Sequence, residues 1–104
     1  MSEEKTAQAY LLREVNKVPG CIALNTQASE YTHRGLPDVV ACIRGEFRSY
    51  EVKDKGKKAT VIQAFVGEKI QEAGGSWTVV QGLEQARRVV RELRDEEDSH
   101  NLHS

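Results

Sequence analysis

The sequence is poor in several residue types, and each shortage narrows what the protein can be. Its 104 residues include only two cysteines, Cys21 and Cys42, and 6% are aromatic. Two cysteines so far apart do not suggest a zinc site, and we expect both to be buried free thiols, as in a reducing cytosol. No run of about 20 apolar residues is present, so we expect no membrane-spanning helix. Residues 1–5 lack the basic and then apolar pattern of a signal peptide.

An excess of charge of one sign is also lacking. The 15 Lys and Arg residues nearly balance the 16 Asp and Glu residues, which leaves a formal net charge of −1. The chain as a whole is therefore not a basic protein that coats DNA. The distribution is uneven, because residues 44–58 hold six Lys or Arg and three acids, whereas residues 95–98 are all acidic. The length suits one domain, which we assign to residues 1–94, with residues 95–104 as an acidic, disordered tail.

Hydrophobic periodicity predicts an α/β fold with the element order α-β-β-β-α-β-α. We expect helices over residues 2–18, 60–73 and 83–93, and strands over residues 21–24, 38–43, 47–53 and 77–80. The strand over residues 38–43 is apolar throughout, which predicts a place in the interior of the sheet. Thr60 and Gln63 have the spacing of a capping box at the start of the second helix.

Two acidic residues are predicted at matching ends of neighbouring strands. Asp38 begins one strand, and Glu51 and Lys53 share one face near the end of the next. If the two strands form a hairpin, both carboxylates meet beside the Lys53 ammonium. Two carboxylates suit a hard divalent cation and a water to be activated. Each motif alone is as readily an ordinary turn or an exposed strand face, but the pairing favours cleavage of a phosphodiester.

With these motifs the sequence resembles the PD-(D/E)xK nuclease superfamily and, more narrowly, a stand-alone VRR-NUC domain. The resemblance rests on residues 35–38 (Gly-Leu-Pro-Asp), residues 50–53 (Tyr-Glu-Val-Lys), Gln63, and residues 74–75 (Gly-Gly) before the strand over residues 77–80. It covers residues 3–93. It implies a restriction-endonuclease-like core, in which a central mixed sheet is flanked by helices.

The resemblance implies a metal-dependent DNA endonuclease. Asp38 and Glu51 would bind Mg²⁺ or Mn²⁺, helped by the backbone carbonyl of Val52. Lys53 would orient the attacking water and stabilise charge that develops on the phosphate. Because a lysine is ordinarily protonated at neutral pH, we expect this role to be electrostatic rather than that of a general base.

Two further residues are implied at the site. Gln63 would lie at its edge and bond to a ligand or substrate group. Members of the family carry another glutamate on the first helix, which would reach the metal through water. Glu4 is our assignment for that glutamate, and Glu3 and Glu14 are the alternatives; a solvated acid in the first helical turn is an equally good interpretation of Glu4.

DNA contacts are expected from the two loops that flank this end of the sheet. Basic and polar side chains there would form a rim for backbone phosphates, although each residue alone is as readily part of a solvated loop. The candidates are Thr26, Gln27, Tyr31, His33, Arg34, Lys55, Lys57 and Lys58.

The leading hypothesis is a phage-type nuclease specific for branched DNA such as a four-way (Holliday) junction, acting in the cytoplasm of a bacterial or phage-infected cell. One domain holds one site, so symmetric cutting of two strands predicts a homodimer. A second hypothesis keeps the fold and predicts a DNA-binding or accessory module that acts only with a helicase or repair partner. A third is a small α/β interaction domain in which the motifs are accidental.

Overall fold

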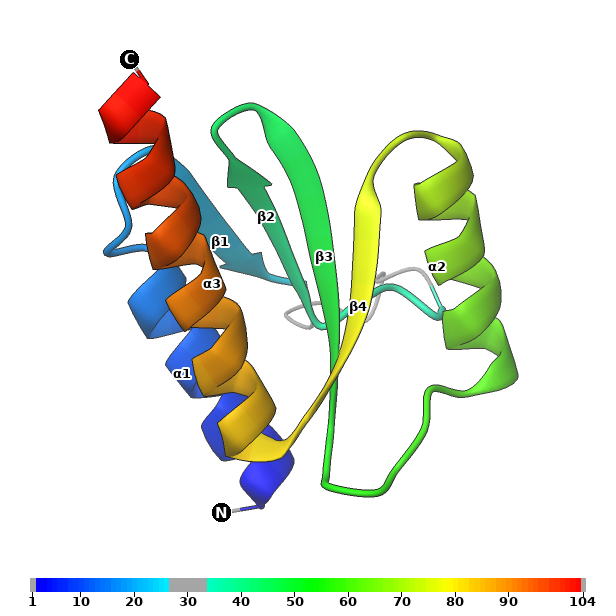
Figure 1. The fold of residues 1–104 in the computed structure, drawn as a ribbon. Helices are drawn as coiled ribbons and strands as arrows, with labels where there is room; N and C mark the ends of the chain where they lie inside the picture. Colours follow the sequence, from blue (N-terminus) through cyan, green and yellow to red (C-terminus); the bar gives the residue numbers. More distant parts are fainter. Residues whose placement is uncertain (1, 27–33, 104) are drawn as a thin grey trace.

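A computed structural model describes residues 2–26 and 34–103, and this part of the chain forms a four-stranded sheet with three helices (Figure 1). In chain order the elements are α1 (Glu3–Val15), β1 (Cys21–Asn25), β2 (Val39–Ile43), β3 (Glu46–Lys53), α2 (Val61–Glu72), β4 (Ser76–Gln81) and α3 (Gly82–His103). The predicted element order and the predicted α/β class are both confirmed.

The sheet is mixed, with the strand order β1-β2-β3-β4. β1 with β2 and β2 with β3 pair antiparallel, whereas β3 and β4 pair parallel. Parallel neighbours need a crossover connection, and α2 supplies it. β2 lies inside the sheet as its apolar sequence predicted, and a tight turn joins it to β3, where Ile43 pairs with Glu46.

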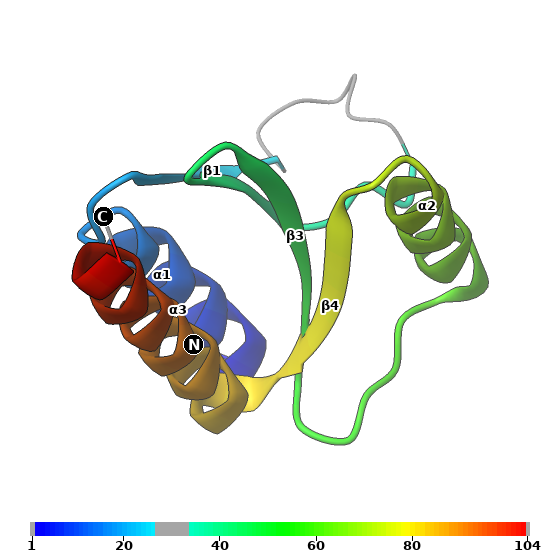
Figure 2. The same cartoon turned by 45° about the horizontal axis from the view of Figure 1, so that its top comes forward.

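One face of the sheet is covered by α1 and α3, which lie side by side (Figure 2). Leu11 and Val15 of α1 meet Val90 and Leu93 of α3 in a core that also takes alternate side chains from every strand. The strand residues of this core are Ala23, Val39, Ala41, Ile43, Tyr50, Val52 and Val80. Below, we call this side of the sheet the helix-pair face.

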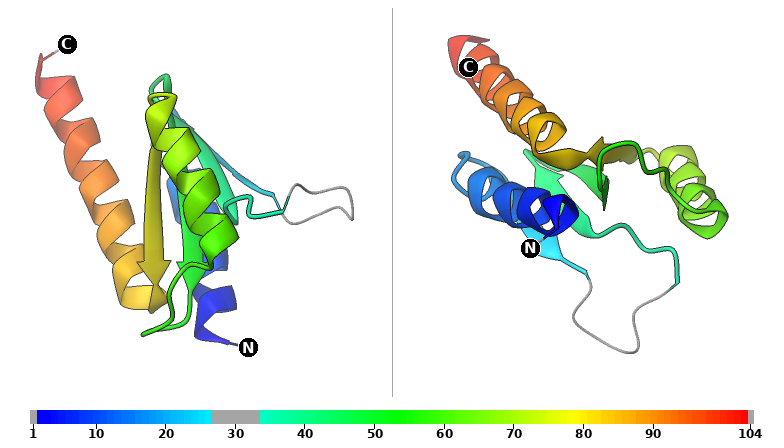
Figure 3. Two further views of the ribbon diagram at one scale, coloured as in Figure 1. Left: turned by 90° about the vertical axis from the view of Figure 1, so that its right-hand side faces the viewer. Right: turned by 90° about the horizontal axis from the view of Figure 1, so that it is seen from below.

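α2 lies on the opposite side of the sheet, against β4 (Figure 3). The approach is close, because a Cβ atom added at buried Gly67 would lie 2.2 Å from the indole ring of Trp77. α2 leaves β1 and β2 open on this side, where Ile22 and Leu24 are about half exposed. Cys42 is exposed there and Cys21 is partly buried, both as free thiols. The prediction that both are buried was wrong, because alternate residues of a strand face opposite sides.

α3 extends beyond its predicted end near residue 93 and continues to His103. The acidic segment that we expected as a disordered tail is helical, and two of its glutamates bind the β2–β3 hairpin. Arg44 Nη1 lies 2.9 Å from Glu97 Oε2, and Arg48 Nη2 lies 2.9 Å from Glu96 Oε2. These partners lie about 50 positions away in sequence, so local composition could not show them.

Residues 16–20 form a turn between α1 and β1, because α1 ends at Val15 rather than at residue 18. Asn16 caps the helix, and its side-chain amide binds both backbone groups of Ala23 in β1 at 3.0 Å. The capping box of Thr60 and Gln63 is present at the start of α2, as predicted. In the described ranges no helix has the length and apolar character to cross a bilayer.

Candidate active site

The carboxyl groups of Asp38 and Glu51 meet at one end of the β2–β3 hairpin. Val39 pairs with Tyr50, so the next pair along the register is Asp38 with Glu51. Asp38 Oδ2 accepts a hydrogen bond of 2.8 Å from the backbone N–H of Val52. Both acids are buried, with Asp38 5% and Glu51 1% exposed. The hairpin therefore places the two carboxyls together, as the spacing of the sequence predicted.

Glu51 is held in an unfavourable environment for a charged carboxylate. Burial, followed by the negative charge of nearby Asp38, raises its pKa from 4.5 to about 8. Lys53 opposes this rise in the pKa, with its Nζ 3.7 Å from Glu51 Oε1. The second oxygen, Oε2, is buried and has no hydrogen-bond partner within residues 2–26 and 34–103. A buried carboxylate oxygen without a partner is costly, and a bound cation would satisfy it.

The side chains of Asp38 and Glu51 are the kind of ligand that a hard divalent cation binds. Two carboxylates side by side, one with an unsatisfied oxygen, are donors that Mg²⁺ and Mn²⁺ prefer. The described ranges hold no group of three or more His, Cys, Asp or Glu side chains arranged to bind a metal. A metal bound here would take Asp38 and Glu51 as its acidic ligands, and backbone carbonyl groups or waters would complete the set.

The segment before Asp38 is fixed from two sides. Gly35 has a left-handed φ of 79°, and a Cβ atom there would lie 2.5 Å from Ile62 Cγ2 in α2. On the other side, the N–H of Thr26 donates to the carbonyl of Asp38 at 3.1 Å, and the Thr26 hydroxyl donates to the carbonyl of Pro37. Glycine is required for both the conformation and the contact, which explains the Gly-Leu-Pro-Asp sequence as a device that positions Asp38.

The start of α1 lies next to the carboxylate pair. The negative charge of Glu4 contributes to the raised pKa of Glu51. Glu3 instead accepts a hydrogen bond from the N–H of Leu83 at the start of α3. Glu14 is the acid shared by ion pairs with Arg13, Lys17 and Arg94, the last at 2.9 Å. Of the three glutamates that the sequence left open, Glu4 is the one whose charge acts on Glu51, while Glu3 and Glu14 bind elsewhere.

Asp54 is a residue of the site that sequence reasoning did not assign. Its Oδ1 accepts a hydrogen bond of 2.7 Å from the backbone N–H of Glu4. A carboxylate at a helix N-terminus binds free N–H groups and favours the positive end of the helix dipole. Asp54 follows Lys53 directly in sequence, so it ties the start of α1 to the end of β3. Its position next to Lys53 in the sequence could have suggested that Asp54 lies near the site. Its contact with the start of α1 depends on how that helix packs, which the sequence does not show.

Gln63 makes structural contacts at the start of α2. Its Oε1 accepts a hydrogen bond of 2.8 Å from the N–H of Thr60, and its own N–H donates to Thr60 Oγ1 at 3.2 Å. These bonds cap α2, the helix that also supports Gly35. A contact between Gln63 and a ligand or substrate remains a prediction.

The candidate DNA-binding residues fall in two loops. Gln27, Tyr31 and His33 lie outside the described residues, whereas Thr26 and Arg34 lie at the boundaries of the described ranges. The second loop follows Lys53, and its three lysines are exposed. They are Lys55, Lys57 and Lys58. The Gln81 side chain donates to the backbone carbonyl of Lys57, which ties this loop to the end of β4 while its lysine side chains remain exposed.

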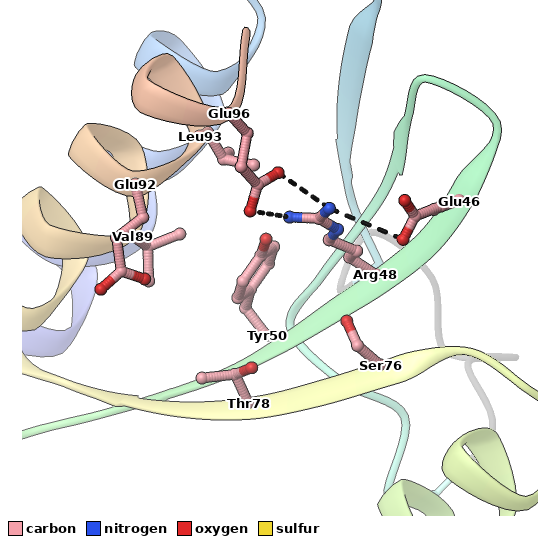
Figure 4. Close-up of a pocket in the computed structure, with 9 residues that line it drawn as sticks. All are labelled: Glu46, Arg48, Tyr50, Ser76, Thr78, Val89, Glu92, Leu93 and Glu96. Carbon is pink, nitrogen blue, oxygen red and sulfur yellow. Dashed lines mark hydrogen bonds and ion pairs between the residues drawn. The ribbon is translucent and has the colours of Figure 1, made fainter. Parts of the chain in front are cut away.

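A polar cavity lies elsewhere, between α3 and strands β3 and β4 (Figure 4). It has a volume of about 280 Å³, and Arg48, Tyr50 and Glu96 are among the residues that line it. Tyr50 precedes Glu51 in β3, and consecutive strand residues face opposite sides of the sheet. The cavity therefore belongs to the helix-pair face and is separate from the carboxylate pair.

Comparison with known proteins supports the fold. No protein-family model and no curated protein matches the sequence. The structure is similar to a solved structure described as a VRR_NUC domain, with a TM-score of 0.73 and 22% sequence identity. The match covers 88% of this chain and 97% of the other. The chain therefore has the fold of a VRR_NUC domain, with a mixed four-stranded sheet and three helices.

Proposed function

We propose that the protein is a divalent-metal-dependent DNA endonuclease that hydrolyses phosphodiester bonds. The observation that carries the proposal is the buried pair of Asp38 and Glu51, with one unsatisfied oxygen and Lys53 beside it. Asp38, Glu51 and the backbone carbonyl of Val52 would hold Mg²⁺ or Mn²⁺. Such an ion polarises a phosphoryl oxygen and makes bound water more acidic. The fold shared with a VRR_NUC domain supports the same class of activity.

The residues around that ion would have separate roles. The Lys53 side chain is 16% exposed, and its ammonium lies 3.7 Å from Glu51 Oε1. From there it would stabilise negative charge on the phosphate and help to orient the attacking water. Asp38 is fixed by the N–H of Val52, which keeps both carboxyls in place before substrate binds. Glu4 would act through an intervening water.

The substrate that we propose is branched DNA, such as a four-way junction in a phage-infected or bacterial cell. The exposed Lys55, Lys57 and Lys58 follow the site and suit contacts with backbone phosphates. A four-way junction presents two equivalent strands, and this chain carries one carboxylate pair in its described ranges. Symmetric cutting therefore calls for a homodimer with one site from each copy.

Cleavage of labelled DNA tests the proposal. A synthetic four-way junction, linear duplex and single strand would be incubated with Mg²⁺, Mn²⁺ or chelator, for wild type and Glu51→Gln. We expect metal-dependent cutting of the junction by wild type and none by the variant. Equal cutting of all three substrates would support nuclease activity but contradict a preference for junctions. Cutting that persists in chelator would show that the carboxylate pair is not a metal site.

A second candidate function is a DNA-binding or accessory module with the same fold. The near-zero net charge favours it, because binding to DNA without help usually relies on an excess of positive charge. This module would bind a divalent cation and branched DNA but turn over only with a helicase or repair partner. Absence of cutting by folded, metal-bound protein would favour this function over the first.

A further inference from the structure

The two edges of the sheet differ in how the rest of the chain covers them. β1 forms one edge and β4 forms the other. At the β1 edge, the side chain of Asn16 binds both the N–H and the carbonyl of Ala23, each at 3.0 Å. An added strand would need these backbone groups, so pairing beside β1 is blocked.

Two hydrogen bonds show which way the backbone of β4 points. The N–H of Gln81 donates to Gln85 Oε1 at 2.8 Å, on the side of β4 away from β3. The carbonyl of Ser76 accepts a hydrogen bond of 2.8 Å from the hydroxyl of Ser49 in β3, so it points toward β3. Both bonds give the same assignment, in which the odd-numbered residues of β4 direct their backbone groups to the free edge.

The groups left open at this edge belong to Trp77 and Val79. In a strand, the N–H and carbonyl of one residue point to the same side, and this side alternates from each residue to the next. Since Gln81 points outward, Trp77 and Val79 do so too, whereas Thr78 and Val80 pair with β3. Within residues 2–26 and 34–103, no other segment supplies a hydrogen bond to the two outward N–H groups and two outward carbonyls.

A groove lies beside this edge, between β4 and α3, with a volume of about 150 Å³. Its apolar lining comes from Val79, Val80 and Val89, and the exposed residues Arg88 and Glu92 add one charge of each sign. An apolar cavity of similar volume can hold benzene, so the groove has room for one aliphatic or aromatic side chain. Figure 3 shows β4 with α3 on one side and α2 on the other. An extended segment can lie along β4 there, whereas a second copy would bring its own α2 and α3 against these helices.

We propose that the open edge of β4 binds an extended segment of a protein partner by strand addition. Such a segment matches the two donors and two acceptors with its own backbone and places an apolar side chain in the groove. The phosphate backbone of DNA offers acceptors alone, so it would leave the two outward carbonyls without a donor. The inference goes beyond the proposed nuclease activity and does not depend on it. A partner bound here would extend the sheet whose next strand, β3, carries Glu51.

Two proline substitutions test the direction of the backbone groups. Proline lacks an N–H, and an edge strand tolerates it where the N–H faces solvent. Val79→Pro should therefore fold with a small fall in Tm. Thr78→Pro is the matched variant, and it should lower Tm by roughly 10–20 °C because it removes a hydrogen bond to β3. Thermal unfolding measures both.

The binding test uses the wild-type chain and an extended peptide with alternating side chains, acetyl-Lys-Val-Thr-Val-Thr-Val-Lys-amide. Amide exchange followed by NMR reports each backbone N–H separately. In the free protein, the N–H groups of Trp77 and Val79 should exchange quickly and those of Thr78 and Val80 slowly. With peptide at roughly 3 mM, exchange of Trp77 and Val79 should slow about fourfold, as for a dissociation constant on the order of 1 mM.

Two controls separate strand addition from other contacts. The same peptide N-methylated at every residue cannot donate from its backbone and should leave the exchange rates unchanged. Val79→Pro removes one outward donor of the protein, so it should weaken binding of the unmodified peptide at least about fivefold, measured at the N–H of Trp77.

Five outcomes would overturn the proposal, and none involves DNA cleavage. Loss of folding in Val79→Pro but not in Thr78→Pro would reverse the direction of the backbone groups. Slow exchange of Trp77 and Val79 in free protein at every concentration would mean that the chain itself covers this edge. Protection that grows with protein concentration would assign the edge to a second copy. Unchanged exchange at 3 mM peptide would rule out strand addition, and equal effects of the two peptides would do the same.

Discussion

The two faces of the sheet differ in what they bury. On the helix-pair face, α1 and α3 enclose apolar side chains such as Leu11 and Val90, which are fully buried. On the other face, the polar residues Ser49 and Glu51 are buried, whereas the apolar residues Leu24 and Phe47 are about half exposed. Burial of apolar groups stabilises a fold, whereas burial of a charged group costs free energy unless a partner is supplied. Stability thus resides mainly on one face, and the candidate metal ligands lie on the other.

The largest effect expected from this contrast is on catalysis. Glu51→Gln keeps the shape of the side chain and removes the charge that would bind a metal, so we expect cleavage to fall at least about a thousandfold, or roughly 4 kcal/mol in transition-state stabilisation. The free energy of unfolding should not decrease, because the carboxylate is unfavourably buried. Single-turnover cleavage and denaturant unfolding measure the two quantities. Glu46→Gln, an exposed acid of the same strand, is the control, and a Glu51→Gln protein that cuts at the wild-type rate would contradict the assignment.

A substitution on the helix-pair face should instead reduce stability and leave cleavage nearly unchanged. Leu11 is fully buried between the helices and the sheet, so Leu11→Ala should reduce the free energy of unfolding by about 2–5 kcal/mol through lost burial and the cavity left behind. Cleavage per folded molecule should change little at a temperature where the variant is folded. Urea unfolding and cleavage by the same preparation would check both. A smaller loss than that caused by Leu24→Ala on the open face would refute the division between the faces.

The pH dependence of stability sharpens the contrast further. The pKa of Glu51 is raised from 4.5 to about 8 in the folded protein, so between these values the folded state binds more protons than the unfolded state. Metal-free protein should therefore lose stability as pH rises through this window, by a few kcal/mol. Urea unfolding in chelator at several pH values measures the slope. The slope attributed to Glu51 should disappear in Glu51→Gln and decrease when Mg²⁺ is added; identical slopes in the two proteins would show that Glu51 does not titrate in this way.

Local patterns predicted the central pair of the site because its geometry is local. Asp38 and Glu51 belong to one hairpin with a short turn, so the alternation of side chains and the strand register were enough to bring them together. The apolar sequence of β2 likewise predicted its interior place in the sheet. The similarity in fold to a VRR_NUC domain agrees with the element order read from the sequence.

The features that the sequence did not reveal depend on packing between distant segments. Cys42 belongs to an apolar run, but it is exposed because α2 lies against β4 and leaves β2 open. In the sequence, Glu96 and Glu97 look like part of a solvated acidic tail. In the structure they pair with Arg44 and Arg48, which the fold brings beside α3. In both cases the deciding partner is an element whose position only the tertiary structure supplies.

The smallest expected effect concerns Asp54, which connects the two faces through α1. The helix packs on the helix-pair face, but Asp54 binds the N–H of Glu4 in its first turn, and the charge of Glu4 acts on Glu51. Asp54→Ala should lower the free energy of unfolding by about 1 kcal/mol, as loss of a helix-capping carboxylate usually does. If Asp54 also positions Glu4, cleavage should fall several-fold through kcat with little change in KM. Steady-state cleavage beside denaturant unfolding would measure both. Asp54→Asn retains an acceptor oxygen and should restore most of each loss. Equal cleavage by wild type and Asp54→Ala would limit Asp54 to a structural role.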